Sequence, residues 1–160
     1  MAFISSTWSP PPTGSYKLNC DASFDSDQWD GGLGYIIRSF EGHPCVVVSH
    51  HMNFPSVHIG ETLSTLAGIM KALATGQVPL LVESDSLDVI NLISDSSASG
   101  DPHLLFVIDD IRHLSVRGEC SLSTSSKRGQ RGEVIWPIAT PRLTGFSILQ
   151  ASDYPPNTVQ

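Results

Sequence analysis

Three acidic residues, Asp21, Glu61 and Asp85, are the strongest candidates for chemistry in this sequence of 160 residues. Asp21 follows the alternating run YKLNC (16–20), Glu61 lies early in a helix-like stretch, and Asp85 follows the apolar run VPLLVES (78–84). If the two runs are parallel neighbouring strands, both end at the edge of the sheet where ligands collect in open α/β sheets. The start of the helix can reach the same edge. The spacing therefore predicts that three carboxylates converge.

Converging carboxylates repel one another unless a cation compensates their charge. Mg²⁺ prefers hard oxygen donors and keeps several waters. Two such ions about 3.5–4 Å apart can activate a water and stabilise the leaving oxygen in phosphodiester cleavage. Other interpretations stay open on spacing alone. Asp21 could be a turn residue, Asp85 could cap a helix, and Glu61 could be a solvated residue near a helix N-terminus.

The elements that must position these acids follow from the apolar pattern. Apolar residues recur at steps of three and four from Ile59 to Ala74, which indicates an amphipathic helix of about five turns. Ser56 is its expected N-cap and Gly76 its expected stop. Strands are expected at residues 16–20, 32–40, 44–52, 78–84 and 120–124, and shorter helices at 86–94 (capped by Ser86 or Asp85) and 103–115.

This order of elements predicts an α/β domain. Two strands joined by the turn EGH suggest an antiparallel hairpin, and a later strand–helix–strand crossover suggests a parallel pair. The result is a mixed sheet with helices packed on it. We divide the chain into an extended lead-in (1–15), the α/β domain (16–125) and an atypical, irregular tail (126–160).

Composition narrows the class of protein. The formal charge of −7, with nine basic residues, argues against a highly basic nucleic-acid binder. The three cysteines lack metal-ligand spacing, so we expect buried, reduced thiols. No apolar run is long enough to span a bilayer and no leader is visible. We expect a soluble intracellular protein, nuclear or cytoplasmic, with no membrane partner.

Four segments together resemble the ribonuclease H family, and most closely its domains in plant proteins and plant retroelement-derived sequences. They are W…PPPTGSYKLNCDASFD, GGLGYIIRSFEG, GETLSTLAGIMKAL and LLVESDSLDVINLI, within residues 8 to 124. The resemblance implies a five-stranded mixed sheet of order 3-2-1-4-5 with flanking helices on both sides. It also implies Mg²⁺-dependent endonucleolytic hydrolysis of the RNA strand in an RNA–DNA hybrid.

The resemblance also assigns roles to residues. Asp21, Glu61 and Asp85 match the catalytic metal ligands, which hold two ions in the family, and Ser23 matches a position close to the nucleic acid. The partner would be an RNA–DNA hybrid or RNA, recognised by contacts to 2′-hydroxyls across a wide minor groove. Recognition of this kind needs less positive charge than tight phosphate binding, so an acidic chain is compatible with it.

One part of the family pattern is missing. The family carries a fourth acid, or a histidine, in a closing helix after the fifth strand, whereas Asp153 lies in a turn-like context and does not match it. The codons of residues 134–140, read two bases along, permit Leu-Ala-His or Leu-Ala-Asp, so we hypothesise a frame or splice change near residue 126. Loss of this ligand would weaken the second metal site. The alternatives to a working enzyme are a non-catalytic nucleic-acid-binding remnant and a truncated pseudoenzyme.

Overall fold

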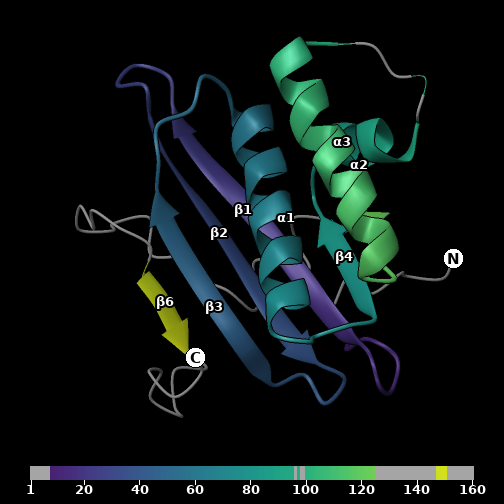
Figure 1. The fold of residues 1–160 in the computed structure, drawn as a ribbon. Coiled ribbons are helices and arrows are strands. Elements are labelled where there is room, and N and C mark those ends of the chain that lie inside the picture. The colour runs from purple at the N-terminus through teal and green to yellow at the C-terminus, as the bar shows by residue number, and fades with distance from the viewer. Residues whose placement is uncertain (1–7, 96, 98–99, 125–146, 151–160) are drawn as a thin grey trace, which may run out of the picture.

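The computed structural model describes residues 8–95, 97, 100–124 and 147–150. These residues form a twisted sheet with helices on it (Figure 1). The elements in chain order are β1 (Tyr16–Asp25), β2 (Asp30–Ser39), β3 (Pro44–His51), α1 (Val57–Ala74), β4 (Leu80–Ser84), α2 (Leu87–Ser94), α3 (Pro102–Arg117), β5 (Ser121–Thr124) and β6 (Ser147–Gln150).

The strand order across the sheet is β5-β4-β1-β2-β3-β6. β4 runs parallel to both β1 and β5, whereas the β1–β2, β2–β3 and β3–β6 pairs are antiparallel. The expected mixed sheet of order 3-2-1-4-5 is therefore confirmed. β6 adds a strand beside β3, within the tail that was expected to be irregular. The rest of the chain after Thr124 lies outside the described residues, including residues 134–140, whose codons suggested a frame change.

β1 is longer than the sequence pattern indicated. The expectation that Asp21 ends the first strand is wrong, because β1 continues to Asp25 along its antiparallel partner β2. The parallel pairing of β1 with β4 ends earlier than β1 itself, at the pair Cys20–Ser84. Asp21 is thus the first residue of β1 beyond β4, so it lies beside the place where β4 ends.

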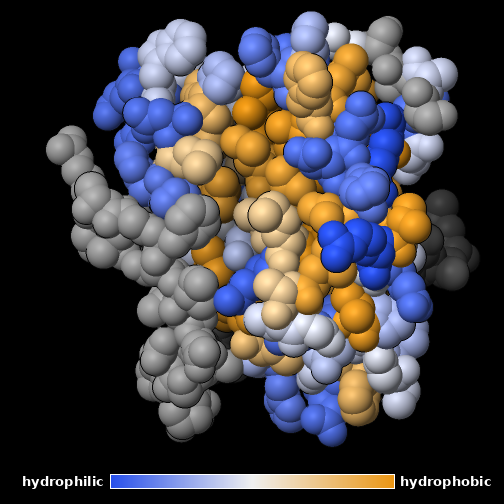
Figure 2. Space-filling model, viewed as in Figure 1, coloured by the Kyte–Doolittle hydropathy of each residue, from blue (hydrophilic) through white to orange (hydrophobic). Residues whose placement is uncertain are grey.

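α1 begins and ends as expected, with Ser56 as its N-cap and Gly76 in a left-handed conformation (φ 70°) just after it. The face that it buries was not foreseen. The buried residues are mostly small or polar: Gly60, Glu61, Thr62, Ser64, Thr65, Gly68, Ile69 and Ala72. The apolar stripe that revealed the helical period lies farther out, with Met70 54% exposed. Figure 2 shows the resulting apolar surface over α1.

Small residues let α1 approach the sheet closely. A Cβ atom added to Gly68 would lie 2.6 Å from a methyl carbon of Leu18, which is itself fully buried on β1. The Ser64 hydroxyl donates a hydrogen bond to the Gly34 carbonyl on β2, which satisfies a polar side chain in this tight contact. Side chains as large as leucine at positions 64 and 68 would hold the helix farther from the strands.

One hydrophobic core lies between the sheet and the described helices. Strand residues such as Leu18, Tyr35 and Val82 form a single cluster with Ile69 of α1, Val89 of α2 and Ile108 of α3. Helices were expected on both faces, and those among the described residues cover this face alone (Figure 1). None of the described helices is long and apolar enough to cross a bilayer.

Candidate metal centre

The three acids chosen from the sequence lie together in the structure. One carboxylate oxygen from each of Asp21, Glu61 and Asp85 can be chosen so that all three atoms lie within 4.8 Å of one another. Glu61 is buried, and the two aspartates are half-buried. The predicted convergence of the three carboxylates is confirmed, although Asp21 lies within a strand and not at its end.

Close packing at the start of α1 brings Glu61 to this position. A Cβ atom on Gly60 would lie 3.1 Å from the Cβ atom of Ala22 and 2.5 Å from the ring of Phe54. Only glycine fits between these groups without a shift, so the first turn of α1 is pressed against β1 one residue after Asp21. Glu61 follows Gly60 directly, and its carboxylate therefore lies close to the point where the pairing between β1 and β4 ends.

The turn between β4 and α2 gives the capping role to Ser86 and not to Asp85. Ser86 is the N-cap of α2, and its hydroxyl oxygen accepts a hydrogen bond from the Val89 backbone N–H. The Ser84 hydroxyl oxygen accepts one from the Ser86 N–H and so helps to shape the turn. Because the cap is supplied by Ser86, the Asp85 carboxylate can face the other two acids.

The negative charge of the three acids affects the buried Cys20 thiol beside them. The pKa of Cys20 is raised to about 12, chiefly by burial; a hydrogen bond with Thr65 lowers this pKa, and the neighbouring Asp21, Asp85 and Glu61 carboxylates raise it. The sulfur lies 3.2 Å from the Thr65 hydroxyl oxygen of α1. All three cysteines are free, as expected, but only Cys20 is buried; Cys45 and Cys120 are half-buried.

This pKa predicts how stability depends on alkaline pH. The thiol of the unfolded chain ionises near pH 9.0, whereas the folded thiol stays protonated to about pH 12. Cys20 therefore stabilises the fold fully below about pH 9, and this contribution falls by at most about 1.4 kcal/mol per pH unit as the pH rises toward 12. We expect urea unfolding of wild type to lose free energy with pH more steeply than that of Cys20→Ala. Parallel pH profiles would contradict this assignment.

The donor set fits a hard divalent cation. Three carboxylates supply only oxygen ligands, which are the ligands that Mg²⁺ prefers, and a cation would offset the mutual repulsion of the acids. Among the described residues, no other group of three or more potential ligands comes together in this way. The arrangement can therefore hold a metal ion at the edge of the sheet where β1 and β4 part.

Ser23, the predicted nucleic-acid contact, lies on β1 two residues beyond Asp21 and is exposed. It pairs with Gly32 of β2, where a Cβ atom would lie 3.2 Å from the Ser23 hydroxyl oxygen. The serine hydroxyl is therefore near the carboxylates along the strand and accessible from outside. Its contact with nucleic acid stays a prediction.

Sequence analysis missed two polar residues that precede the aspartates. Asn19 lies two residues before Asp21, and Glu83 lies two residues before Asp85. They are register partners on β1 and β4 and are joined by a side-chain hydrogen bond of 2.8 Å. The repeated spacing of a polar residue two positions before each aspartate was the available signal.

Comparison with known proteins supports the family. The profile of the reverse transcriptase-like family matches residues 19–146, which is more than half of the chain. No curated protein matches this chain in sequence. Ribonuclease H1 of the halophilic archaeon Halobacterium salinarum is similar in structure, with a TM-score of 0.68 and 15% identity over 74% of this chain and 90% of the other.

Two further solved structures show the same fold. The N-terminal ribonuclease H domain of a Mycobacterium tuberculosis protein has a TM-score of 0.65 and 14% identity over 71% of this chain and 84% of the other. A ribonuclease H1 isolated from compost, solved with an RNA/DNA hybrid, has a TM-score of 0.64 and 12% identity over 71% and 87% of the two chains. The chain belongs to the reverse transcriptase-like family and has a ribonuclease H-like fold.

Proposed function

We propose that this chain is an endonuclease that hydrolyses the RNA strand of RNA–DNA hybrids, using Mg²⁺ held by Asp21, Glu61 and Asp85. The observation that carries the proposal is the convergence of three carboxylates, one from within β1, one from the early part of α1 and one from the residue after β4. Family membership and the similar fold of a ribonuclease H1 solved with an RNA/DNA hybrid add support.

Each residue would have a defined part in this reaction. Bound Mg²⁺ would supply activation of the attacking water and stabilisation of the leaving oxygen. The three carboxylates would bind and orient the metal. Glu61, the buried member, would be held in place by the close packing of Gly60 against β1. The exposed Ser23 hydroxyl would contact the sugar–phosphate backbone, and RNA would be selected through its 2′-hydroxyls.

A non-catalytic nucleic-acid-binding remnant is the second candidate. The described carboxylate group has three members, whereas the family resemblance implies a fourth ligand in a closing helix. The segment in which that helix was expected lies outside the described residues. With three ligands the second metal site would be weaker. The chain would then retain hybrid or RNA binding and lose turnover.

The deciding experiment uses an RNA–DNA hybrid labelled separately on each strand. We expect the full chain with Mg²⁺ to cut the RNA strand at internal positions, to leave the DNA strand intact, and to stop when EDTA is added. Binding of the hybrid without cleavage would favour the remnant. A broad, non-cooperative thermal transition with neither binding nor cleavage would favour a truncated pseudoenzyme, since small intact domains usually unfold cooperatively.

A further inference from the structure

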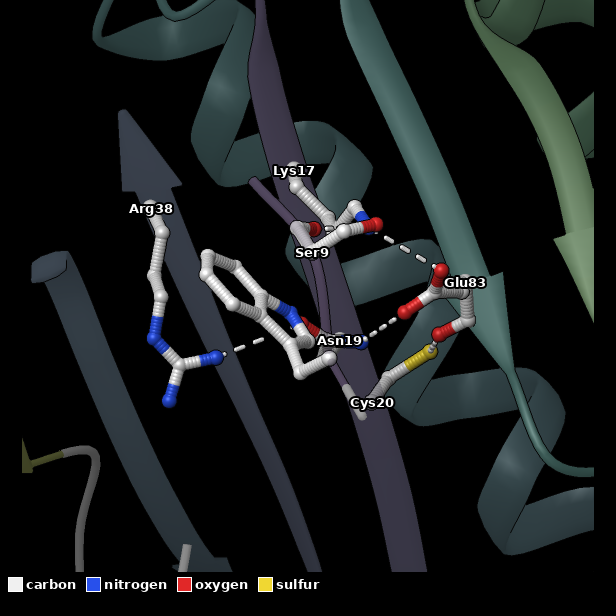
Figure 3. Close-up of polar contacts among 7 residues, drawn as sticks. Ser9, Lys17, Asn19, Cys20, Arg38 and Glu83 are labelled. Carbon is white, nitrogen blue, oxygen red and sulfur yellow. Dashed lines mark hydrogen bonds and ion pairs between the residues drawn. The ribbon is translucent and has the colours of Figure 1, made fainter. Parts of the chain in front are cut away.

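A polar network lies on the sheet face opposite α1, next to the candidate metal centre. Figure 3 views this face, with the helices behind the strands. The Asn19 amide nitrogen donates to Glu83 Oε2 at 2.8 Å, and Lys17 Nζ donates to Glu83 Oε1 at 3.1 Å. Two side chains that are neighbours on one face of β1 thus both donate hydrogen bonds to the Glu83 carboxylate of β4.

The lead-in holds the Asn19 amide from its other side. Asn19 Oδ1 accepts one hydrogen bond from Trp8 Nε1 at 3.1 Å and another from Arg38 at 3.3 Å. An amide flipped by 180° would point its NH₂ group at two donors, so this arrangement permits only one orientation. With Oδ1 turned toward Trp8 and Arg38, the nitrogen can face only Glu83.

Two buried cationic side chains restrict how far the members of the network can move apart. Lys17 is 2% exposed and Arg38 is 7% exposed, and the two cationic groups lie 5.2 Å and 4.9 Å from the centre of the Trp8 ring. Lys17 also donates to the Ser9 backbone carbonyl. Buried charges of this kind are stable only when their partners are correctly placed. Glu83 must therefore stay within reach of Lys17.

The network lies next to the point where the acids leave the paired strands. We call this point the β1–β4 fork: the two strands pair in parallel up to Cys20–Ser84, then β1 continues along β2 and β4 ends. The Asn19–Glu83 pair is one step before the fork, and Asp21 and Asp85 are the first residues after it. A change in strand separation at Asn19–Glu83 would therefore change the separation of the two aspartates.

We propose that Asn19 is a positioning residue that sets the spacing of the metal-binding aspartates by tying Glu83 to β1, with Trp8 of the lead-in fixing the Asn19 amide. The inference rests on the metal-binding role proposed above. It gives the N-terminal segment a functional part, because residues outside the strands would determine the geometry of the metal centre.

The test measures the affinity of the folded full chain for Mn²⁺ in the absence of nucleic acid. Electron paramagnetic resonance detects the free ion and so gives the dissociation constant. Asn19→Leu removes the amide and keeps the branched shape, the number of heavy atoms and the neutral charge of the side chain. We expect its dissociation constant for Mn²⁺ to rise roughly tenfold or more, the usual effect of removing a group that orients metal ligands. All measurements are made at a temperature where circular dichroism shows each variant to be folded.

Arg112→Ala is the matched control for a general loss of stability. Arg112 on α3 donates to the Leu92, Ile93 and Asp95 carbonyls of α2 and its C-cap, and it has no part in the network. We expect this variant to be less stable than wild type and to bind Mn²⁺ with unchanged affinity. If Arg112→Ala and Asn19→Leu weakened Mn²⁺ binding equally, the affinity for Mn²⁺ would simply follow the stability of the fold. That result would overturn the inference.

The remaining outcomes separate this inference from the proposed function. If wild type binds Mn²⁺ no more tightly than Asp21→Asn does, the metal-binding role itself fails. If wild type binds more tightly than Asp21→Asn and Asn19→Leu matches wild type, only the positioning role fails. Should Asn19→Leu not fold, Trp8→Phe removes the indole N–H donor and keeps an aromatic ring; a smaller loss of affinity is then expected, and an unchanged affinity overturns the inference.

Discussion

Replacing Asp21 by asparagine is expected to lower kcat/KM for cleavage of an RNA–DNA hybrid by roughly a thousandfold or more. The estimate assumes that loss of a ligand forfeits about 4 kcal/mol of the several that a bound metal contributes to the transition state, at about 1.4 kcal/mol for each factor of ten. Asparagine keeps the volume of aspartate and removes the charge. The measurement is steady-state cleavage of a labelled hybrid at saturating Mg²⁺.

Stability should change in the opposite direction. Without a metal ion, the three carboxylates within 4.8 Å repel one another, so Asp21→Asn should unfold at the same or a higher urea concentration than wild type. Asp25→Asn is the matched control, because Asp25 is an exposed residue at the far end of the same strand. Activity of Asp21→Asn within tenfold of wild type, or an equal loss in Asp25→Asn, would contradict the assignment of Asp21 as a ligand.

Truncation of Leu18 to alanine is expected to destabilise the fold by about 2–5 kcal/mol, because this fully buried side chain fills the contact between β1 and α1. Gly68→Ala alone should be destabilising too. Alanine favours a helix by about 1 kcal/mol over glycine, but its methyl group would lie 2.6 Å from a Leu18 methyl carbon, and overpacking costs about 1–3 kcal/mol. Urea unfolding followed by circular dichroism measures both effects.

The double variant tests whether these two residues touch. The methyl group introduced by Gly68→Ala would occupy part of the cavity left by Leu18→Ala, so the double variant should be more stable than the sum of the single variants by about 0.5–3 kcal/mol. Combining Gly68→Ala with Ile108→Ala gives the control, because the three atoms nearest to a Cβ at Gly68 all belong to Leu18. Strict additivity of Leu18→Ala and Gly68→Ala would mean that α1 does not approach β1 closely here.

Local signals in the sequence predicted the elements well. Ser56 and Ser86 cap α1 and α2 because a serine hydroxyl oxygen accepts a first-turn N–H, a property of the residue and its immediate neighbours. The order of strands and helices, read with the family resemblance, also gave the central sheet topology. The three acids were found because strand ends and helix starts in this order meet at one edge of the sheet.

Properties that depend on distant partners were not predictable in the same way. The end of β1 is set by β2, which keeps pairing after β4 has stopped. The buried face of α1 is set by Gly60 and Gly68. The need for glycine at these positions becomes visible only when Phe54 and Leu18 are placed against them. Periodicity finds the helix but cannot tell which of its faces is buried when the contact face is made of small and polar residues.

By itself, the sequence determined the type and order of most elements, the helix caps and the choice of Asp21, Glu61 and Asp85, because these follow from local propensity and from the direction of successive strands. Only the tertiary structure decided how closely the three carboxylates approach, and that Trp8, Asn19 and Glu83 form one network beside them. The physical reason is the range of the interactions. Caps and periods act over a few residues, whereas the candidate metal centre and the polar network beside it depend on side chains that meet only after the sheet has assembled.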